Sequence, residues 1–347
     1  MRRRHRTVFR LILLVIPVFL IVHYLLGGPK RVPMKEGTVE LDKLCSEVAN
    51  DCYIVKQSVH RSQKVTRFLV SEKHSQNGYF TISSVPMKID HTGNLAPDYS
   101  SLSFECINAM VVASYMTSSL RLNREGRVLS LGLGGGTLDM FLYSRQPLLD
   151  LTVVELDPTM EEVARKWFGA VEDARRRTVL GDGAEFVRLA AREGIKYDAI
   201  ELDACNAAEE LFRCPAEAFY DDETMRSMKE ALTEGGVLVI NLLSSNKSIL
   251  YTKVKEHFPF CWMARMRTEN EVVACAKKEP EEAVMEKFKE VSRALGLAAR
   301  IGFVKFDRFT VPRTKIVEGD AQTKCMCTQR RIIDKGTNGS VFIDEER

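Results

Sequence analysis

The chain has 347 residues, of which 45% are hydrophobic and 28% are charged, and its formal net charge is only +3. A chain of this length and composition can bury a hydrophobic core in one large or two modest domains. We expect no nucleic-acid-binding surface, because much of the positive excess lies in five arginines at the extreme N-terminus: Arg2, Arg3, Arg4, Arg6 and Arg10.

An uncharged apolar segment follows the basic residues 1–10. Leu11–Leu26 would rise roughly 24 Å as a helix, slightly short of a typical hydrocarbon core. We predict an uncleaved signal-anchor at residues 11–26, because Leu26-Gly27-Gly28-Pro29 lacks the small residues of a cleavage site, and a core helix has little support beside the arginines. The positive-inside rule places the N-terminus in the cytoplasm and the rest of the chain in the lumen or outside the cell. Asn246 and Asn338 would then be glycosylation acceptors.

The nine cysteines are compatible with that location, and their odd number leaves at least one unpaired or pairing between chains. Cys261 and Cys275 fall in apolar runs, where a plain buried thiol is expected. Cys325-x-Cys327 lacks the partner ligands of a zinc site, so no metal is predicted, and a disulfide from this pair to Cys45 or Cys52 stays open.

The N-terminal third is predicted to be a linker followed by a small sheet. Residues 27–50 suggest a short basic linker and a helix at Leu41–Asn50. Residues 51–100 alternate polar and β-branched positions between polar turns, and end in a hairpin over Pro86–Tyr99. This alternation predicts a small antiparallel β-domain.

Residues 101–278 alternate strand-like and helix-like segments, which predicts a doubly wound, mainly parallel α/β sheet. After an apolar helix at Leu102–Ser118, the run Arg127–Asp157 is typical of strand, glycine turn, helix, second strand and terminal acids. Gly132, Gly134 and Gly136 let the backbone turn tightly and approach a ligand, while the N-terminal amides of the next helix face that ligand. A tight turn without a ligand is the simpler interpretation of the glycines alone.

Two acids identify the kind of ligand. Glu155 and Asp157 end the second strand about twenty residues past the glycines, where a carboxylate can accept hydrogen bonds from ribose hydroxyls. A dinucleotide fingerprint has the spacing G-x-G-x-x-G, whereas here the third glycine comes one residue early and Thr137 takes its usual place. This spacing favours S-adenosylmethionine or a close relative over NAD.

Later strands are expected to deliver polar residues to the same edge of the sheet. Asp182 follows the third strand and can accept from an adenine amine, with Gly183 leaving room for the purine; alternatively, Asp182 only caps the next helix. Asp203 ends the fourth strand, where it could act as general base for an attacking amine or cap the following turn. Asn241, near the end of the fifth strand, is a less secure member of this group.

The remaining elements complete the predicted fold. Helices are predicted at Pro158–Phe168, Gly183–Arg192 and Asp221–Leu232, and a hairpin of Phe260–Met266 with Glu271–Ala276 closes the sheet. Residues 279–347 are expected to form a C-terminal helix and an irregular extension.

Five segments together resemble the spermidine synthase fold, including the spermidine-synthase-like domain of methyltransferase-like protein 13: VLSLGLGGGTLDMFL, VVELDPTMEEVARKWF, VLGDGAEFV, YDAIELDACNAAEELF and EAFYDDETMRSMKEALTEGGVLVINLLS. The resemblance implies a small β-domain on a seven-stranded class I methyltransferase sheet. It also implies an adenosyl ligand at the glycine turn, with Glu155 on the ribose and Asp182 and Gly183 at the adenine. Asp203 falls at the position of the catalytic aspartate of aminopropyltransferases.

The chain departs from those enzymes at the acceptor site. They resemble D-S-S-D after the fourth strand, and their second aspartate helps to hold the cationic amine, whereas here the run is Asp203-Ala204-Cys205-Asn206. Asn206 is thus a neutral candidate for substrate binding, and Ser103-Phe104-Glu105-Cys106 replaces a Tyr-His/Gln-Glu run. Losing a carboxylate that pairs with a buried ammonium costs on the order of 2–5 kcal/mol, so the methyltransferase-like branch is the better match.

We therefore interpret the chain as a membrane-anchored S-adenosylmethionine-dependent methyltransferase of the spermidine-synthase-like group. The alternatives are an aminopropyltransferase that uses decarboxylated S-adenosylmethionine, and a non-catalytic binding or scaffold protein. The expected partners are an amine-bearing acceptor, either a protein or a small molecule, the membrane through the N-terminal helix and, in a homodimer, a second copy of the chain.

Overall fold

The computed structural model describes residues 34–75, 81–117, 119–208, 211–243 and 247–309. The predicted signal-anchor, Cys325, Cys327 and both glycosylation motifs' asparagines, Asn246 and Asn338, lie outside the described residues. Within the described part, no helix is both long enough and apolar enough to cross a membrane.

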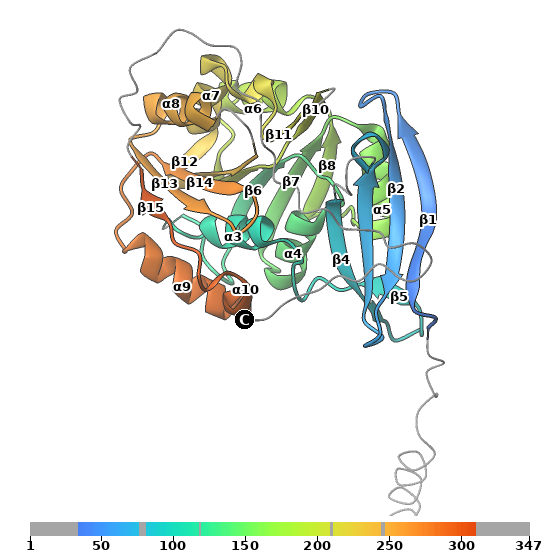
Figure 1. Ribbon diagram of the computed structural model, residues 1–347. Helices are drawn as coiled ribbons and strands as arrows, with labels where there is room; N and C mark the ends of the chain where they lie inside the picture. Colours follow the sequence, from blue (N-terminus) through green and yellow to red (C-terminus); the bar gives the residue numbers. More distant parts are fainter. Residues whose placement is uncertain (1–33, 76–80, 118, 209–210, 244–246, 310–347) are drawn as a thin grey trace, which may run out of the picture.

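An antiparallel sheet of five strands, in sequence order, forms the N-terminal domain (Figure 1). Its strands are β1 (Gly37–Ser46), β2 (Asp51–Val59), β3 (Val65–Ser71), β4 (Thr81–Ile89) and β5 (Leu95–Pro97). The prediction of a helix at Leu41–Asn50 is wrong, because the segment alternates along β1 and then turns at Asn50, whose φ is +48°. The predicted hairpin over Pro86–Tyr99 is present as β4 and β5.

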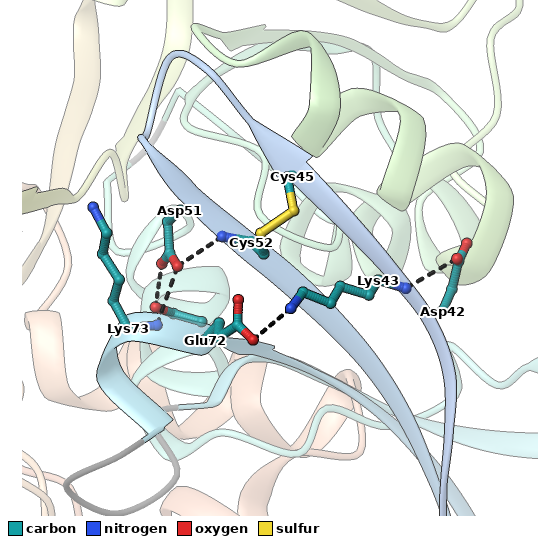
Figure 2. Close-up of a disulfide and its surroundings, with 8 residues drawn as sticks. Asp42, Lys43, Cys45, Asp51, Cys52, Glu72 and Lys73 are labelled. Carbon is teal, nitrogen blue, oxygen red and sulfur yellow. Dashed lines mark hydrogen bonds and ion pairs between the residues drawn. A yellow bond between two sulfur atoms is a disulfide. The ribbon is translucent and has the colours of Figure 1, made fainter.

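The turn between β1 and β2 is fixed by a disulfide and by Asp51 (Figure 2). Cys45 and Cys52 lie directly opposite each other in the β1–β2 register, so their sulfurs meet across the two strands. The buried Asp51 carboxylate accepts hydrogen bonds from the backbone of Cys52 and of Lys73, at the start of the short helix α2 (Glu72–Ser75). These contacts tie β1, β2 and α2 together.

The second sheet contains eight strands, in the order β15-β13-β14-β12-β9-β6-β7-β8. Strands β12, β9, β6, β7 and β8 run parallel, whereas β14, β13 and β15 are added antiparallel, so the sheet is more mixed than the predicted seven-stranded one. The strands are β6 (Gly126–Leu131), β7 (Leu149–Glu155), β8 (Arg176–Leu180), β9 (Tyr197–Leu202), β12 (Leu232–Leu242), β13 (Phe260–Arg265), β14 (Glu271–Ala276) and β15 (Asp307–Arg308). A small hairpin, β10 (Asn206–Ala208) and β11 (Leu211–Arg213), follows β9.

Helices cover both faces of this sheet (Figure 1). One face packs against α3 (Glu105–Ala113), α4 (Thr137–Arg145), α5 (Pro158–Phe168), α9 (Val284–Ala294) and α10 (Ala298–Ile301). The other packs against α6 (Gly183–Arg192), α7 (Asp222–Ala231) and α8 (Lys247–His257), and a 3-10 turn at Glu217–Phe219 precedes α7. Helix α8 was not predicted, whereas α5 and α6 have the predicted bounds.

The two sheets are joined chiefly through α5. The Asp42 carboxylate of β1 accepts hydrogen bonds from the Trp167 indole and the Lys166 ammonium, both at 2.8 Å. Arg67 of β3 donates to the Trp167 carbonyl oxygen at 2.7 Å, and Tyr99 donates to that of Phe168 at 2.5 Å. These contacts hold the β-domain against the C-terminal end of α5.

Three disulfides lie among the described residues, and they correct two sequence-based expectations. Cys261 and Cys275 are bonded to each other across β13 and β14, and so are not plain thiols. Cys45 pairs with Cys52, which closes the option of a bond to the C-terminal cysteines. The third bond joins Cys205 to Cys214 across the base of the β10–β11 hairpin.

Candidate functional site

The glycine turn occupies the end of β6, at the carboxyl edge of the parallel strands. Gly132, Gly134 and Gly136 have φ angles of +97°, +52° and +72°, a backbone region that other residues rarely adopt. A Cβ at Gly132 would lie 2.5 Å from the Asp203 carbonyl oxygen, so the turn packs directly on the end of β9. Gly136 is the N-cap of α4. The sequence therefore places each predicted glycine where the turn requires it.

Glu155, the last residue of β7, faces this turn. Its Oε2 accepts a hydrogen bond from the Leu133 backbone at 2.9 Å, and its Oε1 accepts one from the Asp157 backbone at 2.9 Å. Burial raises the pKa of Glu155, while these two amides act in the opposite direction. Each carboxylate oxygen keeps a lone pair after one bond, so a fixed acceptor remains for neighbouring hydroxyls.

Asp157 and Asp182 both cap helices. The buried Asp157 accepts from the Thr159 backbone at the start of α5, and from the Tyr53 hydroxyl of β2. Asp182 is exposed, and one of its oxygens accepts from the Ala184 and Glu185 backbones at the start of α6. Asp182 thus caps α6, as its alternative interpretation predicted. Among the described residues, no hydrogen bond to the second carboxylate oxygen of Asp182 would prevent its contact with a ligand.

Gly183 and two exposed leucines define the surface between Glu155 and Asp182. A Cβ at Gly183 would meet the Phe219 ring at 3.1 Å, so this glycine serves the close packing of α6. Leu156 and Leu180 are 59% and 53% exposed; the first directly follows β7 and the second ends β8. Neither leucine was predicted as a site residue, although each adjoins a predicted one: Leu156 lies between Glu155 and Asp157, and Leu180 lies two residues before Asp182. Leu156 is the next residue after Glu155, and Leu180 lies opposite Glu155 in the β7–β8 register.

Asp203 lies just after β9 and has a defined partner. Its Oδ1 accepts a hydrogen bond from the Asn241 side chain of β12 at 2.7 Å, and the Asn241 oxygen in turn accepts from Asn270 at 2.9 Å. Burial raises the pKa of Asp203 to about 6, while the Asn241 bond favours the ionised form. At neutral pH the group is therefore mainly a carboxylate with a raised proton affinity, as a general base requires.

The disulfide of Cys205 and Cys214 adjoins this carboxylate. The Cys205 Sγ lies 3.8 Å from the Asp203 Oδ1. Although the two sulfurs and the carboxylate are close enough to surround an ion, bonded sulfurs provide no thiolate for it. Asn206 begins β10, opposite Arg213, and its side chain lies outside the described part of the structure.

Other acids near Asp203 also accept hydrogen bonds, and one of them, Glu201, is fully buried. Glu105, in the first turn of α3, accepts from the Arg267 backbone at 2.7 Å. Its neighbour Cys106 is buried, and burial with the nearby Asp203 charge raises the pKa of this thiol to about 12. Deeper along β9, Glu201 accepts from the Ser114 hydroxyl at 2.6 Å, and burial raises its pKa to about 8. Asp203 is therefore the carboxylate best suited to meet a ligand here.

Comparisons with known proteins agree on the type of domain. Residues 110–257 match the model of the spermine/spermidine synthase domain. The eEF1A lysine and N-terminal methyltransferase of Mus musculus is 28% identical over 256 residues, which are 72% of this chain and 36% of that protein. The chain thus spans about a third of the length of this curated relative.

Two solved structures are similar in fold. Human methyltransferase-like protein 13, solved in complex with SAH, is 26% identical with a TM-score of 0.51, covering 62% of this chain and 98% of that one. A probable spermidine synthase from Corynebacterium glutamicum is 15% identical with a TM-score of 0.56, covering 77% and 90% of the two chains. The second likeness concerns the fold alone.

Proposed function

The chain carries a spermine/spermidine synthase-like domain, and from this premise we propose that it is an S-adenosylmethionine-dependent methyltransferase with an amine acceptor. The observation that carries the proposal is the Glu155 carboxylate, which two backbone amides fix at the glycine turn with its remaining lone pairs free. A ribose diol is the ligand group that such an acceptor fits. The likeness to a methyltransferase solved with SAH supports the same ligand.

The residues around Glu155 fit an adenosyl group. The exposed Leu156 and Leu180 would contact the apolar faces of the purine, and the Asp182 oxygen without a cap bond would accept from its amine. Asp157 caps the start of α5 and would influence the ligand by holding that segment of the chain in place. Such a ligand supplies an electrophilic methyl group on a sulfonium. The chain's own task is then to orient an acceptor nitrogen toward that methyl.

Asp203 would perform this second task. Its carboxylate can accept a hydrogen bond from the acceptor amine, aim the nitrogen lone pair and take up the proton that the nitrogen loses after transfer. The run Asp203-Ala204-Cys205-Asn206 provides one carboxylate, because the second acid of the related pattern is replaced by Asn206. A single amine, such as a lysine side chain or a protein N-terminus, matches this charge better than a diamine. The name of the mouse relative specifies acceptors of this class.

The second candidate is an aminopropyltransferase that uses decarboxylated S-adenosylmethionine. It is favoured by the family match and by the position of Asp203 at the end of β9. The neutral Asn206 speaks against it, because the distal ammonium of a diamine would be desolvated without a partner. A scaffold protein that has kept the fold is the third candidate.

A transfer assay separates these candidates. The wild-type chain and Asp203→Asn are each incubated with methyl-labelled S-adenosylmethionine and eEF1A as a protein probe, and with decarboxylated S-adenosylmethionine and putrescine. We expect methylated protein from the wild type, at least about tenfold less from Asp203→Asn, and little spermidine. Robust spermidine formation would favour the aminopropyltransferase, and an absence of both products together with no cofactor binding would favour the scaffold.

We further propose that the domain lies in the lumen or outside the cell, anchored by Leu11–Leu26 with the N-terminal arginines in the cytoplasm. The apolar segment and the arginines support this orientation. The three disulfides of the described residues support it as well, because such bonds persist in oxidising compartments. Protease added to intact microsomes should leave the domain uncut, and cleavage without detergent would reverse the orientation.

A further inference from the structure

The N-terminal β-domain reaches the glycine turn through Ser83 of β4. The Ser83 hydroxyl accepts a hydrogen bond from the Gly135 backbone at 2.9 Å, and the serine is 4% exposed. A Cβ at Gly135 would lie 2.7 Å from the Ser83 Cβ, so strand and turn are in direct contact. Gly135 stands between two glycines with left-handed backbone angles, and its buried amide needs this acceptor. Ser83 therefore belongs to the structure of the turn.

The same domain reaches Glu155 through Tyr53 of β2. The Tyr53 hydroxyl donates to the Asp157 Oδ2 at 2.7 Å, and the Asp157 Oδ1 caps α5 through Thr159. The Asp157 backbone then donates to the Glu155 Oε1 at 2.9 Å. Burial and the Asp157 charge raise the pKa of Tyr53, so the hydroxyl stays a neutral donor. A continuous path of hydrogen bonds thus runs from the β-domain to the carboxylate that faces the turn.

We propose that the β1–β5 domain completes the adenosyl-ligand site, with Tyr53 as a positioning residue for Glu155 and Ser83 as one for the glycine turn. This inference rests on the proposed function. Without Tyr53, the buried Asp157 oxygen loses its partner, and the segment that presents a backbone amide to Glu155 loses its anchor. Without Ser83, a buried amide of the turn is left unpaired. A domain that only stabilised the fold would lower the melting temperature of such variants and leave the affinity of the folded protein unchanged.

The test compares S-adenosylhomocysteine with its 2′,3′-dideoxy analogue, by calorimetric titration of the full chain. Tyr53→Phe should weaken binding of the first about tenfold and of the second less than about twofold, because the analogue offers no hydroxyl to Glu155. Combining Tyr53→Phe with Glu155→Ala should add little to the loss from Glu155→Ala alone. Ser83→Ala should weaken both ligands about equally, since the turn amide is separate from the ribose contact.

Matched controls are available in the same chain. Tyr143→Phe removes another tyrosine hydroxyl that donates to an aspartate, Asp173, away from Glu155, and should leave both affinities unchanged. Ser58→Ala removes a buried serine hydroxyl of β2 that accepts a hydrogen bond from Thr38, and serves as the control for Ser83. Melting curves without ligand report whether each variant is folded, and Ser83→Ala tests the proposal if Tyr53→Phe does not fold.

The outcomes distinguish the two proposals. Equal losses for both ligands in Tyr53→Phe, or wild-type affinity in both Tyr53→Phe and Ser83→Ala, would overturn the positioning role while leaving the proposed function in place. A wild-type chain that binds no S-adenosylhomocysteine would overturn the proposed function and this inference together.

Discussion

Replacing Asp203 with asparagine should stabilise the free protein at neutral pH, although Asp203 is the proposed acceptor-side base. Burial raises the pKa of this carboxyl from 3.8 to about 6. At about 1.4 kcal/mol per pKa unit, the ionised carboxylate costs the folded state about 3 kcal/mol at most, and about 1–2 kcal/mol after solvent screening at the partly exposed strand end. Asp203→Asn removes this cost and keeps an oxygen that can accept from Asn241.

The direction of the Asp203 pKa shift determines how the stability gained from Asp203→Asn depends on pH. Because the folded pKa is the higher one, the folded state binds more protons than the unfolded state between pH 3.8 and about 6, and stability falls as the pH rises through this window. The advantage of Asp203→Asn over the wild type should therefore be near zero at pH values below that window, and constant above it.

Urea unfolding at a series of pH values measures this difference. Glu201→Gln is a matched control on the same strand, because burial raises the pKa of Glu201 from 4.5 to about 8. Its advantage should keep growing until about pH 8, beyond the point where that of Asp203→Asn becomes constant. If Asp203→Asn were no more stable than the wild type at neutral pH, the carboxylate would not be desolvated and the argument for its raised proton affinity would fail.

Three further predictions concern the core, the acceptor site and the disulfides. Asp139→Ala should lower the free energy of unfolding by about 3–5 kcal/mol in urea titrations, because it leaves the fully buried Arg176 guanidinium without its main counter-charge. A loss under about 1 kcal/mol would contradict this prediction. Asn206→Asp should raise any residual spermidine formation from putrescine, measured by chromatography. If spermidine formation did not rise, position 206 would take no part in binding the amine. Non-reducing peptide mapping should recover Cys205 joined to Cys214, and recovery of both as free thiols from native protein would refute the assigned bond.

The local patterns in the sequence were sufficient for much of the α/β domain. Pro158–Phe168 has a first-turn proline and an apolar stripe within one segment, and α5 has those bounds. The glycine turn and Glu155 were likewise predicted from one continuous run. The error at β1 arose because Leu41–Asn50 combines apolar and charged residues at spacings that also fit a helix, and pairing with β2 decided the outcome.

What the sequence could not predict depends on partners distant along the chain. Asn241 meets Asp203 only because β12 pairs with β9, and Tyr53 meets Asp157 only because the β-domain docks on α5. The pairing of Cys261 with Cys275 required the register of β13 and β14. The exposure of Leu156 and Leu180 likewise follows from the edge of the assembled sheet. Formation of a homodimer stays a prediction, which light scattering would test.

We propose above all that an adenosyl ligand binds at the glycine turn and that Glu155 holds its ribose. Calorimetric titration of the wild type and Glu155→Ala with S-adenosylmethionine and with its decarboxylated form tests it most directly. We predict that the wild type binds S-adenosylmethionine in preference to the decarboxylated form. Glu155→Ala, while still folded, should bind it at least about tenfold more weakly, because hydrogen bonds to a charged acceptor are worth about 1.5–3 kcal/mol. Unchanged affinity in Glu155→Ala, or no binding of either ligand to the wild type, would contradict the account.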